Sequence, residues 1–373
     1  MPIGFKILAV DPGSTSTKVA LYVDEHAEFT TVLRHSDTEL KPFRDRRILD
    51  QQQFRLAQIE SALTSAQINI RDLHAVVGRG GLLPPLASGT YLVDEHMLDE
   101  LRLARRGEHA SNLGAFLAHA IASEAGVKAY VVDPVSVDEW TDCARLSGCA
   151  VLDRQCLSHA LNSKAVAKRY ARECGKGYES MRLIVCHLGS GISVSAHENA
   201  RMIDVTNSRE EGAFSADRAG GVPAMQLVEL CFSGKYTQKE MEQLLFHEGG
   251  LYSYLGTKDL AEVERRIIAG DAQAAKVYEA MVYQIAKEIG AMATVLKGSV
   301  EAILLTGGMA HSERLVMAIT ERIGWIVPTK VYPGEDELQA LTEGVLRVLR
   351  HEEPARVFTA KVLLPTSAVG TSV

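Results

Sequence analysis

The sequence lacks the short motifs that bind structural metals or cross membranes. None of its six cysteines forms a C-x-x-C pair, which argues against a structural zinc site. No apolar run approaches the roughly 18 residues of a membrane-spanning helix. The first residues carry no basic segment followed by a long apolar core, so no signal peptide is expected. These absences predict a cytoplasmic protein with reduced thiols and no membrane partner.

Positive charge is also scarce. The chain has 40 Lys and Arg residues against 47 Asp and Glu, a formal net charge of −7. Nucleic-acid binders usually carry a basic face, so no nucleic-acid partner is expected. The Walker A and H-E-x-x-H spacings are absent, and the G-x-G that begins at Gly189 has Val194 where G-x-G-x-x-G requires glycine. An anionic ligand would therefore be held by locally placed cations and backbone N–H groups.

The patterns that are present indicate an α/β protein with more than one domain. A length of 373 residues predicts two to three domains, and strand-like runs alternate with helical periodicity. Strands are expected at 7–10, 19–23, 73–77, 129–132, 183–187, 192–195 and 302–305, and helices at 53–66, 109–125, 277–297 and 336–350.

One pattern occurs twice at a separation close to half the chain. A strand, a small-residue turn and a second strand surround Gly13, and the same order surrounds Gly189. Solenoid repeats have periods of about 20–50 residues, so this longer period indicates a duplicated domain.

Three glycine turns are candidates for nucleotide binding. Gly13 lets a ligand approach the backbone of residues 11–18, whose hydroxyls, Lys18 and N–H groups could cradle phosphate. An ordinary polar turn is the alternative. The second turn at 187–191 and a glycine pair at 307–308 favour the nucleotide, which offers several phosphates and a nucleoside.

Charged residues near glycines or strand ends are candidates for catalysis. Arg79 and Arg218 lie beside glycines, which suits bidentate capture of an anion, although surface charge is the common explanation. Asp133 ends a strand, where it could bind Mg²⁺ or cap a turn. His159 could be catalytic or a core histidine. Acidic residues at 335–337 open a helix, where the helix dipole alone would favour them.

Taken in chain order, these segments resemble those of the acetate and butyrate kinases. This family of carboxylate phosphotransferases belongs to the superfamily of actin, sugar kinases and heat-shock chaperone ATPases. Asp11 stands where acetate kinases carry Asn, and Arg79 begins R-G-G in place of H-G-G. Both segments look closer to the butyrate and branched-chain fatty acid kinase branch. The matching segments are 11–18, 76–81, 133–134, 158–164, 185–191, Arg218, 306–309 and 335–338.

The resemblance implies two duplicated actin-like (ribonuclease H-like) α/β domains around a nucleotide cleft. An N-terminal lobe, 1–150 plus 336–373, would carry the first phosphate turn and the substrate arginine. A C-terminal lobe, 151–335, would carry the second phosphate turn, the adenosine loop and the dimerisation surface. A homodimer or larger homo-oligomer is implied.

The implied reaction is reversible transfer of the γ-phosphoryl group of ATP to butyrate or a branched-chain analogue, giving acyl phosphate and ADP. The implied catalytic residues are Arg79, Asp133, His159 and Arg218. The residues implied to bind ATP or ADP are Asp11, Gly13, Ser14, Thr15, Ser16, Lys18, His187, Gly189, Ser190, Gly191, Gly307, Gly308 and Met309. Those implied to place Mg²⁺ are Asp11, Asp133, Asp336 and Glu337.

Two alternatives stay open at this point. The chain could be an acetate or propionate kinase, which acids of different length would distinguish. It could also be a nucleotide-gated binding ATPase of the actin or chaperone type. Against the second alternative, no peptide-binding domain is expected after the second lobe.

Overall fold

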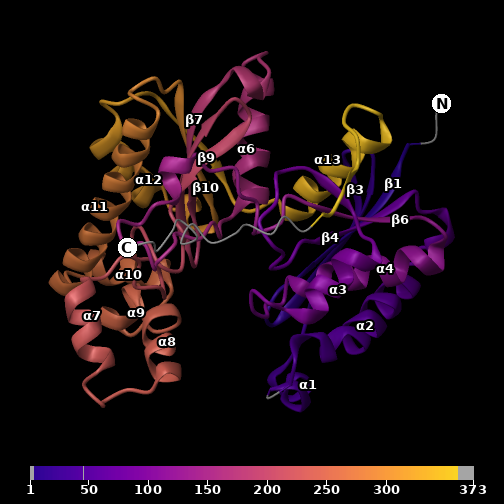
Figure 1. Ribbon diagram of the computed structural model, residues 1–373, viewed down its shortest axis with the longest axis horizontal. Helices are drawn as coiled ribbons and strands as arrows, with labels where there is room; N and C mark the ends of the chain where they lie inside the picture. Colours follow the sequence, from indigo (N-terminus) through magenta and orange to yellow (C-terminus); the bar gives the residue numbers. More distant parts are fainter. Residues whose placement is uncertain (1–3, 45, 360–373) are drawn as a thin grey trace, which may run out of the picture. The chain divides into compact units, whose positions relative to one another are not determined.

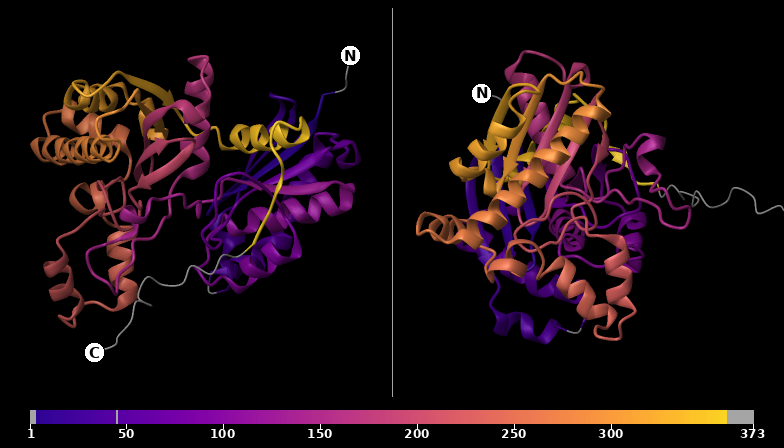
Figure 2. Two further views of the ribbon diagram at one scale, coloured as in Figure 1. Left: turned by 45° about the horizontal axis from the view of Figure 1, so that its top comes forward. Right: turned by 90° about the vertical axis from the view of Figure 1, so that its left-hand side faces the viewer.

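The computed structural model describes residues 4–44 and 46–359, which form two compact units. The first unit contains residues 4–138 and 336–359, and the second contains residues 139–335 (Figures 1 and 2). No helix in the described ranges is long and apolar enough to cross a membrane. The predicted N-terminal lobe also includes residues 1–3 and 360–373, which lie outside the described part of the chain.

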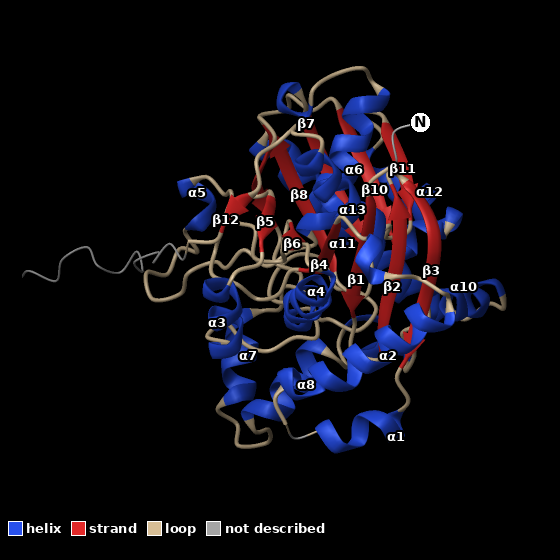
Figure 3. Cartoon of the chain, turned by 90° about the vertical axis from the view of Figure 1, so that its right-hand side faces the viewer, coloured by secondary structure: helices blue, strands red, loops and turns tan. Residues whose placement is uncertain are grey.

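The first unit is built on a seven-stranded mixed sheet with the order β12-β5-β6-β4-β1-β2-β3 (Figure 3). β1 pairs antiparallel with β2 and parallel with β4, and β4 is parallel to β6. Leu8 and Ile7 point to opposite faces of β1, and both are fully buried, so both faces of the sheet are covered. The strands are β1 (Lys6–Pro12), β2 (Ser16–Val23), β3 (His26–Arg34), β4 (Ala75–Arg79), β5 (Thr90–Leu92), β6 (Lys128–Val132) and β12 (Arg356–Val357).

Two helices cover the faces of this sheet (Figure 1). α4 (Asn112–Ala125) shares a core with Leu8, while Gly344 of α13 (Glu337–Leu349) lies against Val132. A Cβ on Gly78 of β4 would overlap the α4 backbone at Gly114, so this strand and helix are in direct backbone contact. The other helices of the unit are α1 (Asp37–Leu40), α2 (Gln52–Ser65), α3 (Glu95–Leu103) and the 3₁₀ turns η1 (Lys41–Phe43), η2 (Ile48–Gln51) and η3 (Ile70–Asp72).

The second unit contains a five-stranded sheet with the order β11-β10-β7-β8-β9. α11 (Ala272–Val295) and α12 (Glu313–Ile323) share a core with Ile184 of β7, whereas α6 (Ala160–Glu173) shares another with Leu183. Adjacent residues of one strand thus face different helices. The strands are β7 (Arg182–Leu188), β8 (Ile192–Glu198), β9 (Arg201–Val205), β10 (Ala302–Gly307) and β11 (Thr329–Pro333).

The second unit has further helices, of which α9 (Gly250–Leu255) and α10 (Leu260–Ile268) add Leu251 and Val263 to the core that contains Ile184. Four of them connect β9 to α11 in the sequence. They are α7 (Ala224–Cys231), α8 (Gln238–Phe246), α9 and α10, and the unit also contains α5 (Asp142–Arg145), η4 (Tyr178–Ser180) and η5 (Gly308–His311).

The two sheets repeat one topology, which confirms the predicted duplication. The order β6-β4-β1-β2-β3 in the first unit corresponds to β11-β10-β7-β8-β9 in the second. Gly13 follows the first strand of one hairpin and Gly189 follows the first strand of the other. The glycine turns predicted from the sequence are therefore equivalent positions of a duplicated α/β fold.

Candidate active site

Three of the predicted site residues lie at the carboxyl ends of neighbouring parallel strands of the first unit. Asp11 is near the end of β1, Arg79 ends β4, and Asp133 comes directly after β6. The register pairs Val10 with Gly78 and Arg79 with Val132. The carboxyl ends of these strands therefore lie at one edge of the sheet, where open α/β sheets bind ligands.

Four charged side chains meet at this edge, and we call them the strand-end cluster: Asp11, Lys18, Arg79 and Glu337. Arg79 Nη1 forms ion pairs with Glu337 and, at 3.4 Å, with Asp11 Oδ1. Lys18 Nζ lies 3.1 Å from Glu337 Oε2 and 3.8 Å from Asp11 Oδ2. Both carboxylates are buried, so each depends on the two cations for stabilisation.

Within the strand-end cluster, the two carboxyl groups differ in their affinity for protons. Burial raises the pKa of Asp11 to about 7. The positive charge of Arg79 opposes this rise, whereas a hydrogen bond with Glu337 adds to it. Burial also tends to raise the pKa of Glu337. This effect is outweighed by the positive charges of Arg79 and Lys18 and by the hydrogen bond from Asp11, so the pKa of Glu337 lies well below its usual range. Of the two carboxyl groups, Asp11 is therefore the one that takes up a proton as the pH falls through about 7, while Glu337 stays ionised.

Asp133 occupies a strained position. Its φ of +37° lies in the left-handed region, which costs a non-glycine residue of the order of 1–3 kcal/mol. Its carboxylate Oδ1 accepts from the Gly89 N–H at 2.7 Å, and its own N–H donates to the Gly89 carbonyl at 3.1 Å. Asp133 thus caps a turn, which is the structural alternative to a role in Mg²⁺ binding. It also carries backbone strain of the kind that clusters at functional sites.

The four residues predicted to place Mg²⁺ are only partly brought together. Asp11 and Glu337 share the strand-end cluster, whereas Asp336 caps the start of α13 without a side-chain capping bond. Across residues 4–44 and 46–359, no group of three or more His, Cys, Asp or Glu side chains is arranged to hold a metal ion.

Two histidines are stacked at the corresponding edge of the second unit. His159 precedes α6, His187 lies near the end of β7, and their ring centroids are 3.8 Å apart with an interplanar angle of 10°. His187 Nδ1 lies 2.9 Å from Asn162 Oδ1, and its Nε2 lies 3.0 Å from Glu335 Oε1. His159 Nδ1 lies 2.9 Å from Ser193 Oγ. These contacts fix both ring planes.

The turn after His187 has no room for side chains at its two glycines. A Cβ on Gly189 would lie 2.9 Å from His187 Nε2 and 3.1 Å from Glu335 Oε1. A Cβ on Gly191 would overlap the guanidinium of Arg218. Ser190, between them, is exposed, and its carbonyl accepts a hydrogen bond from the Ser215 hydroxyl. The turn therefore presents backbone at its surface.

The guanidinium of Arg218 is hydrogen-bonded to neutral groups of Ser208. Its Nη1 donates to Ser208 Oγ at 2.9 Å and to the Ser208 carbonyl at 3.3 Å. Burial lowers the pKa of Arg218, although the neighbouring Asp217 opposes the shift. A partly desolvated guanidinium with such partners is suited to an incoming anion.

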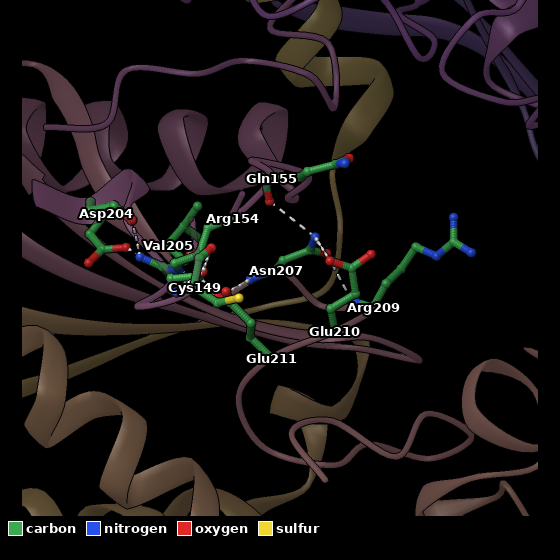
Figure 4. A network of polar contacts seen from close by, with 11 residues as sticks. Cys149, Arg154, Gln155, Asp204, Val205, Asn207, Arg209, Glu210 and Glu211 are labelled. Atoms are coloured by element: carbon green, nitrogen blue, oxygen red, sulfur yellow. Dashed lines mark hydrogen bonds and ion pairs between the residues drawn. The ribbon is translucent and has the colours of Figure 1, made fainter. Parts of the chain in front are cut away.

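A polar network holds the loop that carries Ser208 (Figure 4). Arg154 binds both oxygens of Glu211, at 2.7 and 2.8 Å, and Asp204 at 3.2 Å. Glu211 accepts from the Asn207 N–H, and the Asn207 side chain donates to the Gln155 carbonyl at 3.1 Å. No local sequence pattern indicates this network, because Arg154 is 57 positions from Glu211 and Gln155 is 52 positions from Asn207.

The third glycine turn follows β10. Gly307, with φ of +92°, packs against the backbone of Leu188 and exchanges two backbone hydrogen bonds with Gly334. Gly308 is exposed, and a Cβ there would meet no atom of the described protein within 4 Å. The protein's own packing therefore explains glycine at 307 but not at 308. Met309, in η5, is partly buried.

Comparison with known proteins identifies the family. The model of the Acetokinase family matches residues 153–324. Butyrate kinase 1 and butyrate kinase 2 of Clostridium acetobutylicum are 50% and 48% identical to the chain, each over 95% of this chain and 99% of the relative. The crystal structure of Porphyromonas gingivalis acetate kinase superimposes with a TM-score of 0.76 at 17% identity, over 91% of this chain and 99% of that one. This likeness confirms the predicted fold class, and the identity to the two relatives shows that the chain belongs to the acetokinase family.

Proposed function

We propose that this chain is a butyrate kinase, which transfers the γ-phosphoryl group of ATP reversibly to butyrate or a branched-chain analogue. The observation that carries the proposal is 50% identity to butyrate kinase 1 over 95% of the chain. A carboxylate oxygen of the acid forms a bond to the γ-phosphorus, and the bond from that phosphorus to the β-phosphate oxygen breaks. The products are an acyl phosphate and ADP.

The second unit would supply the groups that neutralise charge on the transferring phosphoryl group. Phosphoryl transfer depends mainly on positioning and charge stabilisation. Arg218, bonded to the neutral Ser208, has the guanidinium best suited to the substrate anions. His159, with Nδ1 held by Ser193, would donate from Nε2 to the phosphoryl oxygens. Arg79 of the first unit shares its charge with two carboxylates, so we assign it the smaller contribution.

The glycine turns would bind the nucleotide. We propose that the turn at residues 13–18 in the first unit and the turn at 187–191 in the second bind phosphates through backbone N–H groups. Gly308 would let adenosine approach the backbone, because the protein leaves the space beside it open. Met309 would lie next to this contact.

The oxygen donors of the strand-end cluster would place Mg²⁺. This ion is commonly held by one or two carboxylates together with water and substrate phosphates, so a preformed cage is not required. We propose that Asp11 and Glu337 hold it, with Asp133 and Asp336 acting directly or through water. When bound, Mg²⁺ would neutralise phosphate charge.

An acid panel tests the function. The chain is assayed with ATP, Mg²⁺ and acids of two to five carbons, and acyl phosphate is trapped as the hydroxamate. We expect the highest kcat/KM with butyrate or isobutyrate. Preference for acetate or propionate would replace the proposal with the alternative kinase, and steady ATP hydrolysis without any acid would favour a binding ATPase.

A further inference from the structure

Beneath the first glycine turn lies a buried arginine that the proposed mechanism does not use. Arg55, on α2, has no solvent-exposed surface. Its Nη1 donates to the carbonyls of Gly13 and Ser16 at 2.8 and 3.0 Å, and its Nη2 donates to the carbonyl of Ser14 at 3.1 Å. Nη1 also lies 3.0 Å from Thr17 Oγ1. One guanidinium thus braces most of the turn.

The contacts of Arg55 orient the peptide groups of this turn. The remaining carbonyl, that of Thr15, accepts from the His35 N–H at 2.9 Å. The carbonyls of residues 13–16 are therefore all held from the protein side. Ser14 and Thr15 are exposed, and within the described residues their N–H groups form no hydrogen bond. The turn is thus arranged as an anion-binding concavity, with donors available to a ligand.

The charge of Arg55 is not balanced by the protein. Its remaining hydrogen bonds go to the neutral Gln51, whose Oε1 accepts from Nε at 3.0 Å and from Nη2 at 2.8 Å. Among residues 4–44 and 46–359, no carboxylate forms an ion pair with Arg55, and burial lowers its pKa to about 10. Buried charges are normally paired, because desolvation disfavours an isolated ion. An unpaired cation below an exposed turn therefore favours an anion above it.

We propose that Arg55 is a positioning residue that shapes the turn at residues 13–17 and supplies the positive charge by which this turn binds a nucleotide phosphate. The inference rests on the proposed function only in taking the anion to be a phosphate of ATP or ADP. Arg55 touches no substrate and acts through the turn.

The main test replaces Gln51 by glutamate. Gln51→Glu is isosteric and keeps an acceptor for Nε and Nη2, but it neutralises the charge of Arg55. A purely bracing role predicts an unchanged or higher Tm and unchanged ADP affinity. The proposed electrostatic role also predicts an unchanged or higher Tm, but about tenfold weaker binding of Mg·ADP by calorimetry. The reason is that a unit charge inside a protein interacts substantially with an anion on the other side of the turn. ADP affinity equal to that of the unaltered chain would overturn the proposal.

A second variant tests the shape of the turn. Arg55→Lys keeps the charge but loses the planar fork that serves several acceptors. We expect the KM for ATP to rise at least tenfold while the KM for butyrate stays within twofold. Arg47→Lys is the matched control, because Arg47 also joins a carbonyl and a carboxylate in the first unit, at Arg102 and Glu108. Equal changes in both KM values, or equal effects in the control, would contradict a positioning role.

The two proposals can fail separately. Calorimetric ADP binding requires no acid substrate, so it tests Arg55 even if the chain phosphorylates none of the acids in the panel. Conversely, unchanged ADP affinity in Gln51→Glu leaves the butyrate kinase assignment intact.

Discussion

Arg79 and Arg218 have similar sequence contexts, but the structure predicts that their removal has different consequences. Arg218 is hydrogen-bonded to Ser208 and is already disfavoured by burial, so Arg218→Ala leaves no carboxylate without a partner. We expect its unfolding free energy to change by no more than about 1 kcal/mol. Its kcat for acyl phosphate formation should fall by about 10³-fold, the contribution typical of a positioned arginine in phosphoryl transfer.

Arg79→Ala has a further cost. It leaves the buried Glu337 and Asp11 with Lys18 as the remaining cation of the strand-end cluster. Removal of one partner from a buried ion pair typically costs about 3–5 kcal/mol. For a unit of this size, each kcal/mol lowers Tm by about 2–4 °C, so the expected loss is about 6–20 °C. Protonation of Asp11 relieves part of the repulsion between Asp11 and Glu337, so we expect a Tm loss near the lower end of this range.

The assay combines thermal unfolding with hydroxamate formation for both alanine variants. The double variant Arg79→Ala, Glu337→Gln is the control, because it removes the carboxylate left unpaired and should recover most of the lost Tm without recovering activity. Equal Tm losses for Arg79→Ala and Arg218→Ala would refute the reasoning, as would an Arg79→Ala variant with the original Tm.

Four further variants test other parts of the same structure. Because burial raises the pKa of Asp11 from 3.8 to about 7, stability from this group is present below the lower value and lost as the pH rises through the upper one. Asp11→Asn should therefore gain Tm relative to the original chain as the pH rises across this window, and a constant difference would contradict the assignment. Asp133→Asn keeps an acceptor for the Gly89 N–H, so its Tm should change by only a few degrees while kcat falls about 100-fold or more; undiminished turnover would make Asp133 a turn residue only. Gly189→Ala places a methyl group 2.9 Å from a fixed histidine nitrogen and should cost about 1–3 kcal/mol. Gly308→Ala meets no protein atom, so it should keep its Tm and raise the KM for ATP; a normal KM would remove adenosine from this turn.

Much of the fold could be predicted because its signals are local. The strands around Gly13 and Gly189 are apolar runs, and the helix found at Ala272–Val295 has a clear apolar stripe. β3 and α6 gave weaker signals: β3 is half exposed, and α6 carries several charged residues, including the buried Lys164 that pairs with Glu139 at 2.6 Å.

The sequence indicates candidate site residues but not the partners that these residues contact. Arg79 and Glu337 are 258 positions apart, and nothing in either local pattern indicates an ion pair. The helix dipole alone explains acidic residues at 335–337, yet Glu335 contacts His187 and Glu337 contacts Arg79. Arg55 resembles any helical surface arginine in the sequence. Only tertiary structure shows that it is buried.

The duplicated topology bears on how the two glycine turns diverged. Equivalent hairpins carry both turns, but the carbonyls of the first are held by the charged Arg55, whereas Ser190 in the second is held by the hydroxyl of Ser215. If both descend from one ancestral hairpin, the backbone was inherited while the supporting side chains changed independently. The duplicated scaffold thus carries two glycine turns in different electrostatic surroundings, one beside a buried cation and one beside a neutral hydroxyl.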